Sequence, residues 1–174
     1  MSTPADISVR GLRELEQALE SIPLRLQRNV MRAALRAGAK VVAEEAKRRA
    51  PVKSGALQKS IRIGSRLRYG VPEASIRAGG RLKDGRSAWY AKIIERGAIP
   101  HEIAVRAGTA SLYINGRAVG KSVQHPGVVA RPFMRPALDT RAREAVESVA
   151  ALVRSRLRTQ HGIDIPDPVA EGDE

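Results

Sequence analysis

The residue types that most often carry chemistry are few in this chain and lie far apart. The three histidines, His101, His125 and His161, are widely separated, and none has the spacing of a metal-ligand pair. His101-Glu102 lacks the second histidine that a zinc-protease helix requires. Cysteine is absent, which excludes disulfides and thiolate metal sites. We therefore predict a protein that is not an enzyme, with no catalytic residues, no metal and no cofactor.

Three further candidates have simpler structural interpretations. Gly120-Lys121-Ser122 resembles the end of a phosphate-binding loop, but Gly116 lies one residue too close to it and a hairpin precedes it. We interpret His125, beside Pro126, as a turn residue rather than a catalytic base. Glu95 ends a short amphipathic pattern, so we interpret it as a surface or interface charge rather than a general acid.

The strongest break in the sequence lies at residues 50–61, which join a long helical pattern to a strand. Pro51 lacks an N–H group and disfavours helical geometry in the residue before it, so the helix should end at about residue 50. We expect Ser54 to cap a short helical turn that carries Leu57 and Ile61. This stretch should fix the helix against the sheet.

Hydrophobic periodicity places the remaining elements. Apolar residues three and four apart predict helices, and strict alternation predicts strands. Asn115-Gly116 between two apolar runs is typical of a two-residue hairpin turn. Trp89, Ile93 and Leu138 are expected to face the core. The predicted helices cover 12–22, 24–49, 87–96 and 136–157; the predicted strands cover 60–69, 71–78, 100–105 and 111–119, with a short one at Ile7 and Val9 and a loop at 121–129.

This order of elements predicts an α+β fold. We expect a mainly antiparallel sheet with a long N-terminal helix, a short inserted helix, and a C-terminal helix packed on it. Residues 1–161 should form a single domain, and 162–174 an acidic, flexible tail. No apolar run approaches the roughly 20 residues of a membrane span, so we expect a soluble protein without a membrane partner.

The charge of the chain is strongly positive and unevenly distributed. The net charge is +13, yet residues 162–174 hold five acids and no Lys or Arg. The remaining 31 Lys and Arg against 13 acids give residues 1–161 a net charge of +18. Such a body should attract nucleic acid or an acidic protein surface, although a solvated arginine-rich surface would give the same count. Aromatic residues make up only 3%, too few for a base-stacking platform.

One row of cations recurs at helical spacing on the long helix. Its members are Arg25, Arg28, Arg32, Arg36 and Lys40. A row of this kind is most often a solvated helix face, and it is also what a groove that meets phosphates would need. Both interpretations remain open from the sequence.

Three blocks in order resemble one known family. They are Arg48 to Ile61, Tyr90 to Gly97, and His125-Pro126-Gly127 followed by Ala130 to Leu138. Together they resemble the tail-component and neck proteins of bacteriophages with long non-contractile tails, of prophages and of gene-transfer agents. Ser54 stands where that family usually has Thr. The motif positions are Pro51, Ser54, Gly55, Leu57, Ser60, Ile61, Tyr90, Ala91, Glu95, Gly97, His101, Pro132, Phe133 and Pro136.

The resemblance implies a structural protein of the virion, assembled in the host cytoplasm. It implies a homo-oligomeric ring, commonly a hexamer, at the head-proximal end of the tail. Such a ring ends tube growth and meets the tail tube protein below and the head–tail connector protein above. Double-stranded DNA passes transiently through the lumen. On this interpretation the Arg25 to Lys40 row and the Asn115-Gly116 turn are candidates for the lumen and for contacts with neighbouring subunits or rings.

Two alternatives stay open from the sequence. The chain could form the head–tail connector or adaptor ring that closes the head, since that role belongs to closely related proteins. It could also be a stand-alone basic nucleic-acid-binding module, which the charge of residues 1–161 favours and the absence of a helix-turn-helix or similar signature disfavours.

Overall fold

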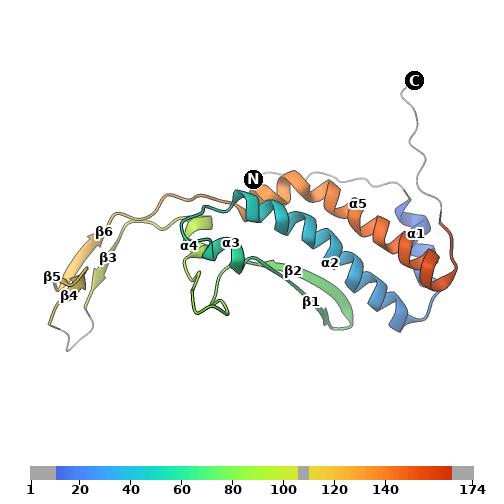
Figure 1. Cartoon of the computed structure of the whole chain (residues 1–174), viewed down its shortest axis with the longest axis horizontal. Helices are drawn as coiled ribbons and strands as arrows, with labels where there is room; N and C mark the ends of the chain where they lie inside the picture. Colours follow the sequence, from blue (N-terminus) through green and yellow to red (C-terminus); the bar gives the residue numbers. More distant parts are fainter. Residues whose placement is uncertain (1–10, 106–109, 166–174) are drawn as a thin grey trace, which may run out of the picture.

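The computed structural model describes residues 11–105 and 110–165, which form five helices and six strands. The α+β class predicted from the sequence is confirmed (Figure 1). The expected strand at Ile7 and Val9 lies outside the described residues. The elements are α1 Leu12–Glu20, α2 Leu24–Arg49, α3 Ala56–Ser60, β1 Arg62–Arg68, β2 Val71–Arg77, α4 Ala91–Arg96, β3 His101–Ala104, β4 Leu112–Ile114, β5 Arg117–Gly120, β6 Ser122–His125 and α5 Met134–His161.

Two long helices, α2 and α5, pack side by side and form the spine of the molecule (Figure 1). α2 follows Pro23 and ends just before Ala50, whose backbone is extended ahead of Pro51, as the proline rule predicts. The helices approach closely at Gly38, where a side chain would lie 2.7 Å from both the Ala145 carbonyl oxygen and Val149 Cγ2. A glycine is therefore required at this crossing.

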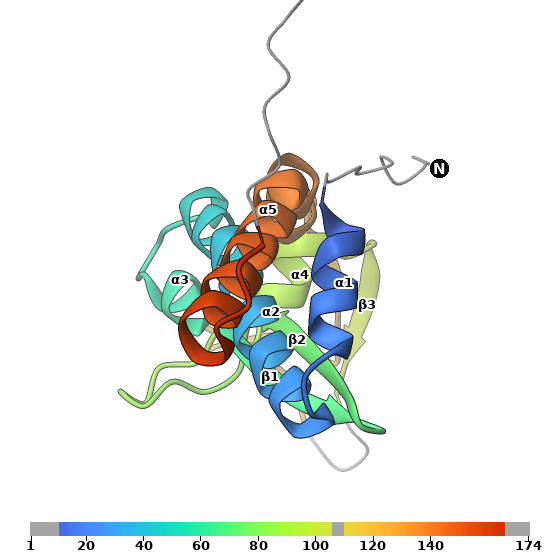
Figure 2. The same ribbon diagram turned by 90° about the vertical axis from the view of Figure 1, so that its right-hand side faces the viewer.

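The β1–β2 hairpin covers the side of α2 that faces away from α5 (Figure 2). Ile63 pairs with Ile76, and both pack against the core, so their face of the hairpin meets α2. The neighbouring pair, Arg62 and Arg77, lies on the opposite, outward face, because successive strand residues alternate sides. α2 is consequently enclosed between a helix and a hairpin.

Two clusters of buried apolar residues lie along α2. One gathers around Phe133 and Leu57 near the C-terminal end of α2, and the other around Val30 and Leu157 near α1. Most members are Ala, Val and Leu, as the scarcity of aromatic residues predicts. The core is long and thin, which suits an elongated molecule.

A β-arm projects from the end of the body opposite to α1 (Figure 1). β3 pairs antiparallel with β6, and β4 pairs with β5 beyond them, joined by the predicted Asn115-Gly116 turn. Both turn residues have positive φ, at 51° and 79°, which is the geometry that this dipeptide favours. The hairpin prediction is confirmed.

The strands form three separate two-stranded sheets rather than one larger sheet. α5 packs on α2 and not on a sheet, because α2 lies between α5 and the β1–β2 hairpin. The predicted loop at 121–129 was wrong in part: Ser122–His125 is strand β6, since its backbone pairs with β3 on the return path of the arm. No helix in the described ranges is long and apolar enough to cross a membrane.

Two predictions of inward-facing residues were also wrong. The helix expected from residue 87 begins only at Ala91, so Trp89 lies in the preceding turn and is 71% exposed. Leu138 is 53% exposed, because α5 turns its Ala137 side toward the core in its first turns. Ile93 is half-buried.

The close approach at Gly38 makes a direct prediction. Gly38→Ala should lower stability, because the new methyl group meets a backbone carbonyl that cannot move without separating the helices. We expect a net cost of about 1–3 kcal/mol, even after the better helix propensity of alanine. Thermal unfolding followed by circular dichroism measures it, with Asn29→Ala on the exposed face of α2 as the control. Equal unfolding temperatures for wild type and Gly38→Ala would contradict the close helix packing at this crossing.

Candidate functional site

The three motif blocks meet at one place, the junction between the body and the β-arm. Leu57 and Ile61 from the first block, Ala91 from the second and Phe133 from the third are all buried in a single apolar cluster. Tyr90 packs against the same cluster and is half-buried. The sequence blocks are therefore parts of one structural joint.

Ser60 ties the first block to the end of the β1–β2 hairpin. Its hydroxyl is 1% exposed, donates to the Leu57 carbonyl at 2.6 Å and accepts from the Gly79 N–H at 2.9 Å. Both the helical turn and the strand exit depend on this one oxygen atom. A nucleophilic role is not supported, because both of its hydrogen bonds go to the backbone.

Ser54 does not have the capping role predicted for it. The residue at the start of α3 is Gly55, with φ 71° in the left-handed region, and no side chain caps the helix. The Ser54 hydroxyl lies 3.4 Å from the Ala56 nitrogen, a long contact, and its carbonyl accepts from Arg86 Nη1 at 2.7 Å. The left-handed turn places the serine one residue too early to be the N-cap. Pro51 is half-buried beside this turn.

Glu95 caps the N-terminus of α5. Its Oε2 accepts from the N–H groups of Phe133 at 2.8 Å and Met134 at 3.0 Å, and its Oε1 accepts from Arg135 at 3.0 Å. A carboxylate at this position satisfies orphan backbone donors and is stabilised by the helix dipole. Glu95 is therefore the cap of α5 and not a free surface charge.

The environment of Glu95 acts on its pKa in opposing directions. Burial raises the pKa, while the backbone N–H groups of Met134, Phe133 and Arg135 and the charge of Arg96 lower it, and the net direction is downward. The ionised form is thus favoured in the folded protein. Its contribution to stability is present above the unfolded pKa of about 4.3 and is lost as the pH falls through the folded pKa.

Gly97 allows the chain to leave α4 and enter the arm. Its φ is 73°, and a side chain there would lie 2.6 Å from the Val128 carbonyl oxygen and 3.0 Å from the Ala130 nitrogen. Next to it, Ala98 and Val128 exchange both backbone hydrogen bonds, at 2.9 and 2.8 Å. The two chains of the arm base are therefore in direct backbone contact, and at Gly97 this contact leaves no room for a side chain.

Two prolines flank the start of α5. Pro136 lies in the first turn of the helix, where its missing N–H removes no hydrogen bond, as predicted. Pro132 precedes it and is exposed. Between them Phe133 turns inward, so the prolines set the direction in which the chain re-enters the body from the arm.

The two arm histidines lie together. His101 and His125 are register partners in β3 and β6, and their rings stack with centroids 5.0 Å apart. His125 is the last residue of β6 rather than a turn residue, and its Nδ1 accepts from the Gly127 N–H at 3.0 Å where the strand ends. His101 Nδ1 lies 2.9 Å from the Ile99 carbonyl oxygen. In the described part of the chain, no group of three or more His, Cys, Asp or Glu residues could hold a metal ion.

The cations of the predicted row on α2 differ in solvent exposure. Arg25, Arg36 and Lys40 are exposed, whereas Arg28 and Arg32 are half-buried. Arg28 lies against the turn of the β1–β2 hairpin, since a side chain at Gly70 would be 3.1 Å from its Nη2. The row therefore does not present one continuous cationic face.

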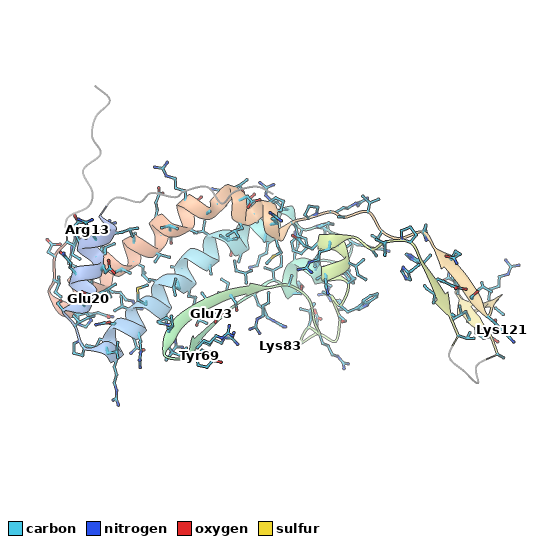
Figure 3. All side chains as sticks on the ribbon, turned by 180° about the vertical axis from the view of Figure 1, so that it is seen from behind. Arg13, Glu20, Tyr69, Glu73, Lys83 and Lys121 are labelled. Atoms are coloured by element: carbon cyan, nitrogen blue, oxygen red, sulfur yellow. The ribbon has the colours of Figure 1, made fainter. Side chains whose placement is uncertain are left out.

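A second group of cations, not singled out from the sequence, lies on the outward face of the β1–β2 hairpin. Arg62, Arg66 and Arg77 are exposed there, and only Glu73 on this face pairs with one of them, at 3.3 Å from Arg66 Nη2. Strand alternation in the predicted hairpin was the signal that could have found this face. Figure 3 labels Glu73, Tyr69 and Lys83 along this edge of the molecule.

Glu45 is a further residue that sequence reasoning missed. It is 8% exposed on α2 and binds Arg49 at 2.7 Å, Arg48 at 2.6 Å and Arg141 of α5 at 3.3 Å. The hydrogen bond from Arg49 is the first cause that lowers its pKa, against burial, which raises it. An acid placed four residues before an arginine on a helix was the available signal. This network links the two long helices near the junction.

Replacing the two serines of the first block, Ser60 and Ser54, should change the stability of the protein by very different amounts. Ser60→Ala leaves the half-buried Gly79 N–H without its partner and should lower stability by about 1–3 kcal/mol. Ser54→Ala, the matched control, should change stability by no more than about 0.5 kcal/mol, as expected for a surface position. Chemical denaturation measures both, and equal effects would show that Ser60 does not hold the hairpin exit to the helical turn.

Glu95→Gln should destabilise the protein at neutral pH by about 1–2 kcal/mol, the usual scale of a lost cap. Because the folded pKa is lowered, wild-type stability should fall as the pH drops from about 5 toward 3, and the variant should lose less over that range. Denaturation curves at several pH values measure this, with Glu147→Gln as the control. Parallel pH profiles for wild type and Glu95→Gln would contradict the capping role.

The family to which the junction motifs point is also found by comparison with known proteins. Residues 13–113, more than half of the chain, match the family model described as "Bacteriophage HK97-gp10, putative tail-component". The matched range contains the first two motif blocks, and the third follows it in the sequence. No curated protein and no solved structure matches the chain. The junction motifs and the family match agree, and the chain belongs to the HK97-gp10-like family of bacteriophage tail components.

Proposed function

We propose that this protein forms a homo-oligomeric ring at the head-proximal end of the phage tail, where it ends tube growth and joins the tail to the head connector. The family membership makes it a structural component of the virion that contacts other tail or head proteins. The terminator role, the ring, commonly hexameric in the family, and the neck position are what the family resemblance implies, and the shape and surfaces of the chain support them.

The observation that carries the proposal is the β-arm. The arm leaves the body as the strand pairs β3–β6 and β4–β5, and the side chains of β3 and β5 are all exposed. An isolated two-stranded ribbon is marginally stable in water, and its free edges favour pairing with another chain. A small protein with such an arm is built to contact neighbours, as a ring subunit must.

The body supports the same proposal. The Glu45 network and the Gly38 crossing hold α2 against α5, and the β1–β2 hairpin closes the other side of α2. We infer that the body without the arm, residues 11–97 and 131–161, acts as a single rigid domain. A subunit of fixed shape sets a fixed angle to its neighbours, which ring closure requires.

Transient contact with double-stranded DNA would fall to the exposed cations. On our proposal the lumen is lined by the outward face of the β1–β2 hairpin with Arg25 and Arg36, rather than by the whole predicted row on α2. The cations are spread over the face and Glu73 offsets one of them, so contacts would be weak and non-specific. Weak contact suits DNA that must pass through.

A connector or adaptor ring that closes the head remains the second candidate, because its subunits would need the same arm and body. A stand-alone nucleic-acid-binding module is the third, supported by the cationic hairpin face. The family match, which is to a tail component, favours the tail role and a non-enzymatic one.

The test is removal of the protein from an assembling phage. Loss of a tail terminator should give tails of uncontrolled length, while loss of a connector should give tails of normal length and heads that release DNA. The purified protein, alone or with tail tubes, should form closed rings visible by electron microscopy. A permanent monomer that binds duplex DNA tightly, with a steep salt dependence and no affinity for tubes, would overturn the proposal.

A further inference from the structure

The outer part of the arm carries apolar side chains that are exposed among the described residues. Tyr113 is 69% exposed and Ile114 50%, both on β4, and Val119 on β5 is 36% exposed. These three residues and the cations Arg117 and Lys121 define the arm tip. Exposed apolar groups on a projecting ribbon indicate a binding surface.

The charged residues of the arm tip are all basic. The sequence contains no Asp or Glu between Glu102 and Asp139, so no acid offsets the exposed Arg117 and Lys121. The arm tip carries both cations and exposed apolar side chains. A partner that fits it must therefore offer acidic groups beside apolar ones.

The opposite end of the molecule has that composition. Figure 3 labels Glu20 at one end and Lys121 at the other. α1 carries three exposed glutamates and Arg13, the adjoining start of α2 adds Arg25, and Arg154 of α5 lies buried against Gly11 at the start of α1. Three leucines beside these glutamates are exposed. The acidic end is defined by Glu14, Glu16, Glu20, Leu12 at 45% exposure, Leu24 at 56% and Leu26 at 38%.

The glutamates of the acidic end differ from most other acids of the chain. Glu44, Glu45, Glu73, Asp84, Glu144, Glu147 and Asp164 are each ion-paired with a Lys or Arg of their own chain. Across residues 11–105 and 110–165, Glu14, Glu16 and Glu20 have no such pair. In a chain this rich in arginine, three unpaired acids on one short helix are available to an outside cation.

Resting on the ring proposed above, we propose that the arm tip of one copy docks on the acidic end of the next copy. Arg117 and Lys121 would face Glu16 and Glu20. Ile114, which shares its face of the hairpin with its register partner Arg117, would cover the exposed leucines together with Val119, while Tyr113 lies on the other face. Because the two surfaces differ and lie at opposite ends, the contact is head to tail. Repeated contacts of this kind close into a ring when the rotation between subunits allows it.

The absence of cysteine makes a disulfide test clean. Protein carrying Val119→Cys is mixed with protein carrying Gln17→Cys and oxidised at about millimolar concentration, with and without tail tubes. We expect a disulfide between the two variants and none within either variant alone. Lys53→Cys, an exposed body position, replaces Gln17→Cys as the control and should not cross-link to the arm.

Charge reversal gives a second, independent readout. Glu16→Lys with Glu20→Lys, and separately Arg117→Glu with Lys121→Glu, should each weaken self-association at least about tenfold, since like charges then oppose each other. Mixing the two reversed proteins should restore association. The control pairs, Asp139→Lys with Glu147→Lys and Lys53→Glu with Arg143→Glu, should leave it unchanged.

Each failure has its own meaning. Rings without the arm-to-α1 disulfide, or arm-to-arm disulfides, would overturn this interface and leave the ring proposal standing. Removing residues 166–174 could abolish association while Glu16→Lys with Glu20→Lys leaves it unchanged. The arm would then bind the C-terminal acidic segment instead, and the proposal would be overturned. No assembly under any condition, with or without tail tubes, would overturn both the interface and the ring.

Discussion

The capping of α5 by Glu95 is the interaction on which the arrangement of the molecule depends. α4 ends where the arm begins and α5 begins where the arm ends, so one carboxylate that binds the first N–H groups of α5 ties both ends of the arm together. The Arg131 N–H, which donates to the Ile94 carbonyl at 2.8 Å, adds a second link across the same gap. Together with the backbone pair of Ala98 and Val128, these contacts hold the two chains of the arm base to each other and to the body.

The close contact at Gly97 makes that direction specific. The Gly97 backbone lies against Val128 and Ala130, and Gly127 lies as closely against the Ala98 carbonyl, 2.4 Å from where its side chain would be. Two glycines therefore let the strands of the arm base meet at a distance that side chains would prevent. The arm is fixed to the body by backbone contacts, by the half-buried Glu95 carboxylate and by the apolar cluster of Leu57, Ala91 and Phe133. Ile99 and Val129 nearby add little packing, because they are 82% and 84% exposed.

Much of this fold could be predicted from the sequence, and the failures have physical causes. Pro23 and Pro51 set the two ends of α2 through local backbone chemistry, so both ends could be predicted from the sequence. The Asn115-Gly116 turn could also be predicted, because it depends only on the dihedral angles of these two residues. β6 was missed because Ser122–His125 has no apolar alternation and becomes a strand only by pairing with β3. The role of Glu95 depends on residues 38 to 40 positions away. The lack of Ser, Thr, Asp or Asn before Met134 was the one sign that the cap of α5 must come from elsewhere.

The position of the motif residues separates two tasks within the chain. Those that pack at the junction, such as Leu57, Ala91 and Phe133, hold the arm to the body, and none of these three lies on the arm tip or the acidic end. A subunit that must meet neighbours at a set angle depends on the rigidity of its joint. It depends separately on the chemistry of its outer surfaces, which can change without disturbing the core because Tyr113, Arg117 and Glu20 are exposed. Substitutions at the junction should therefore unfold or misdirect the arm, while substitutions at the surfaces should change only which partner it accepts.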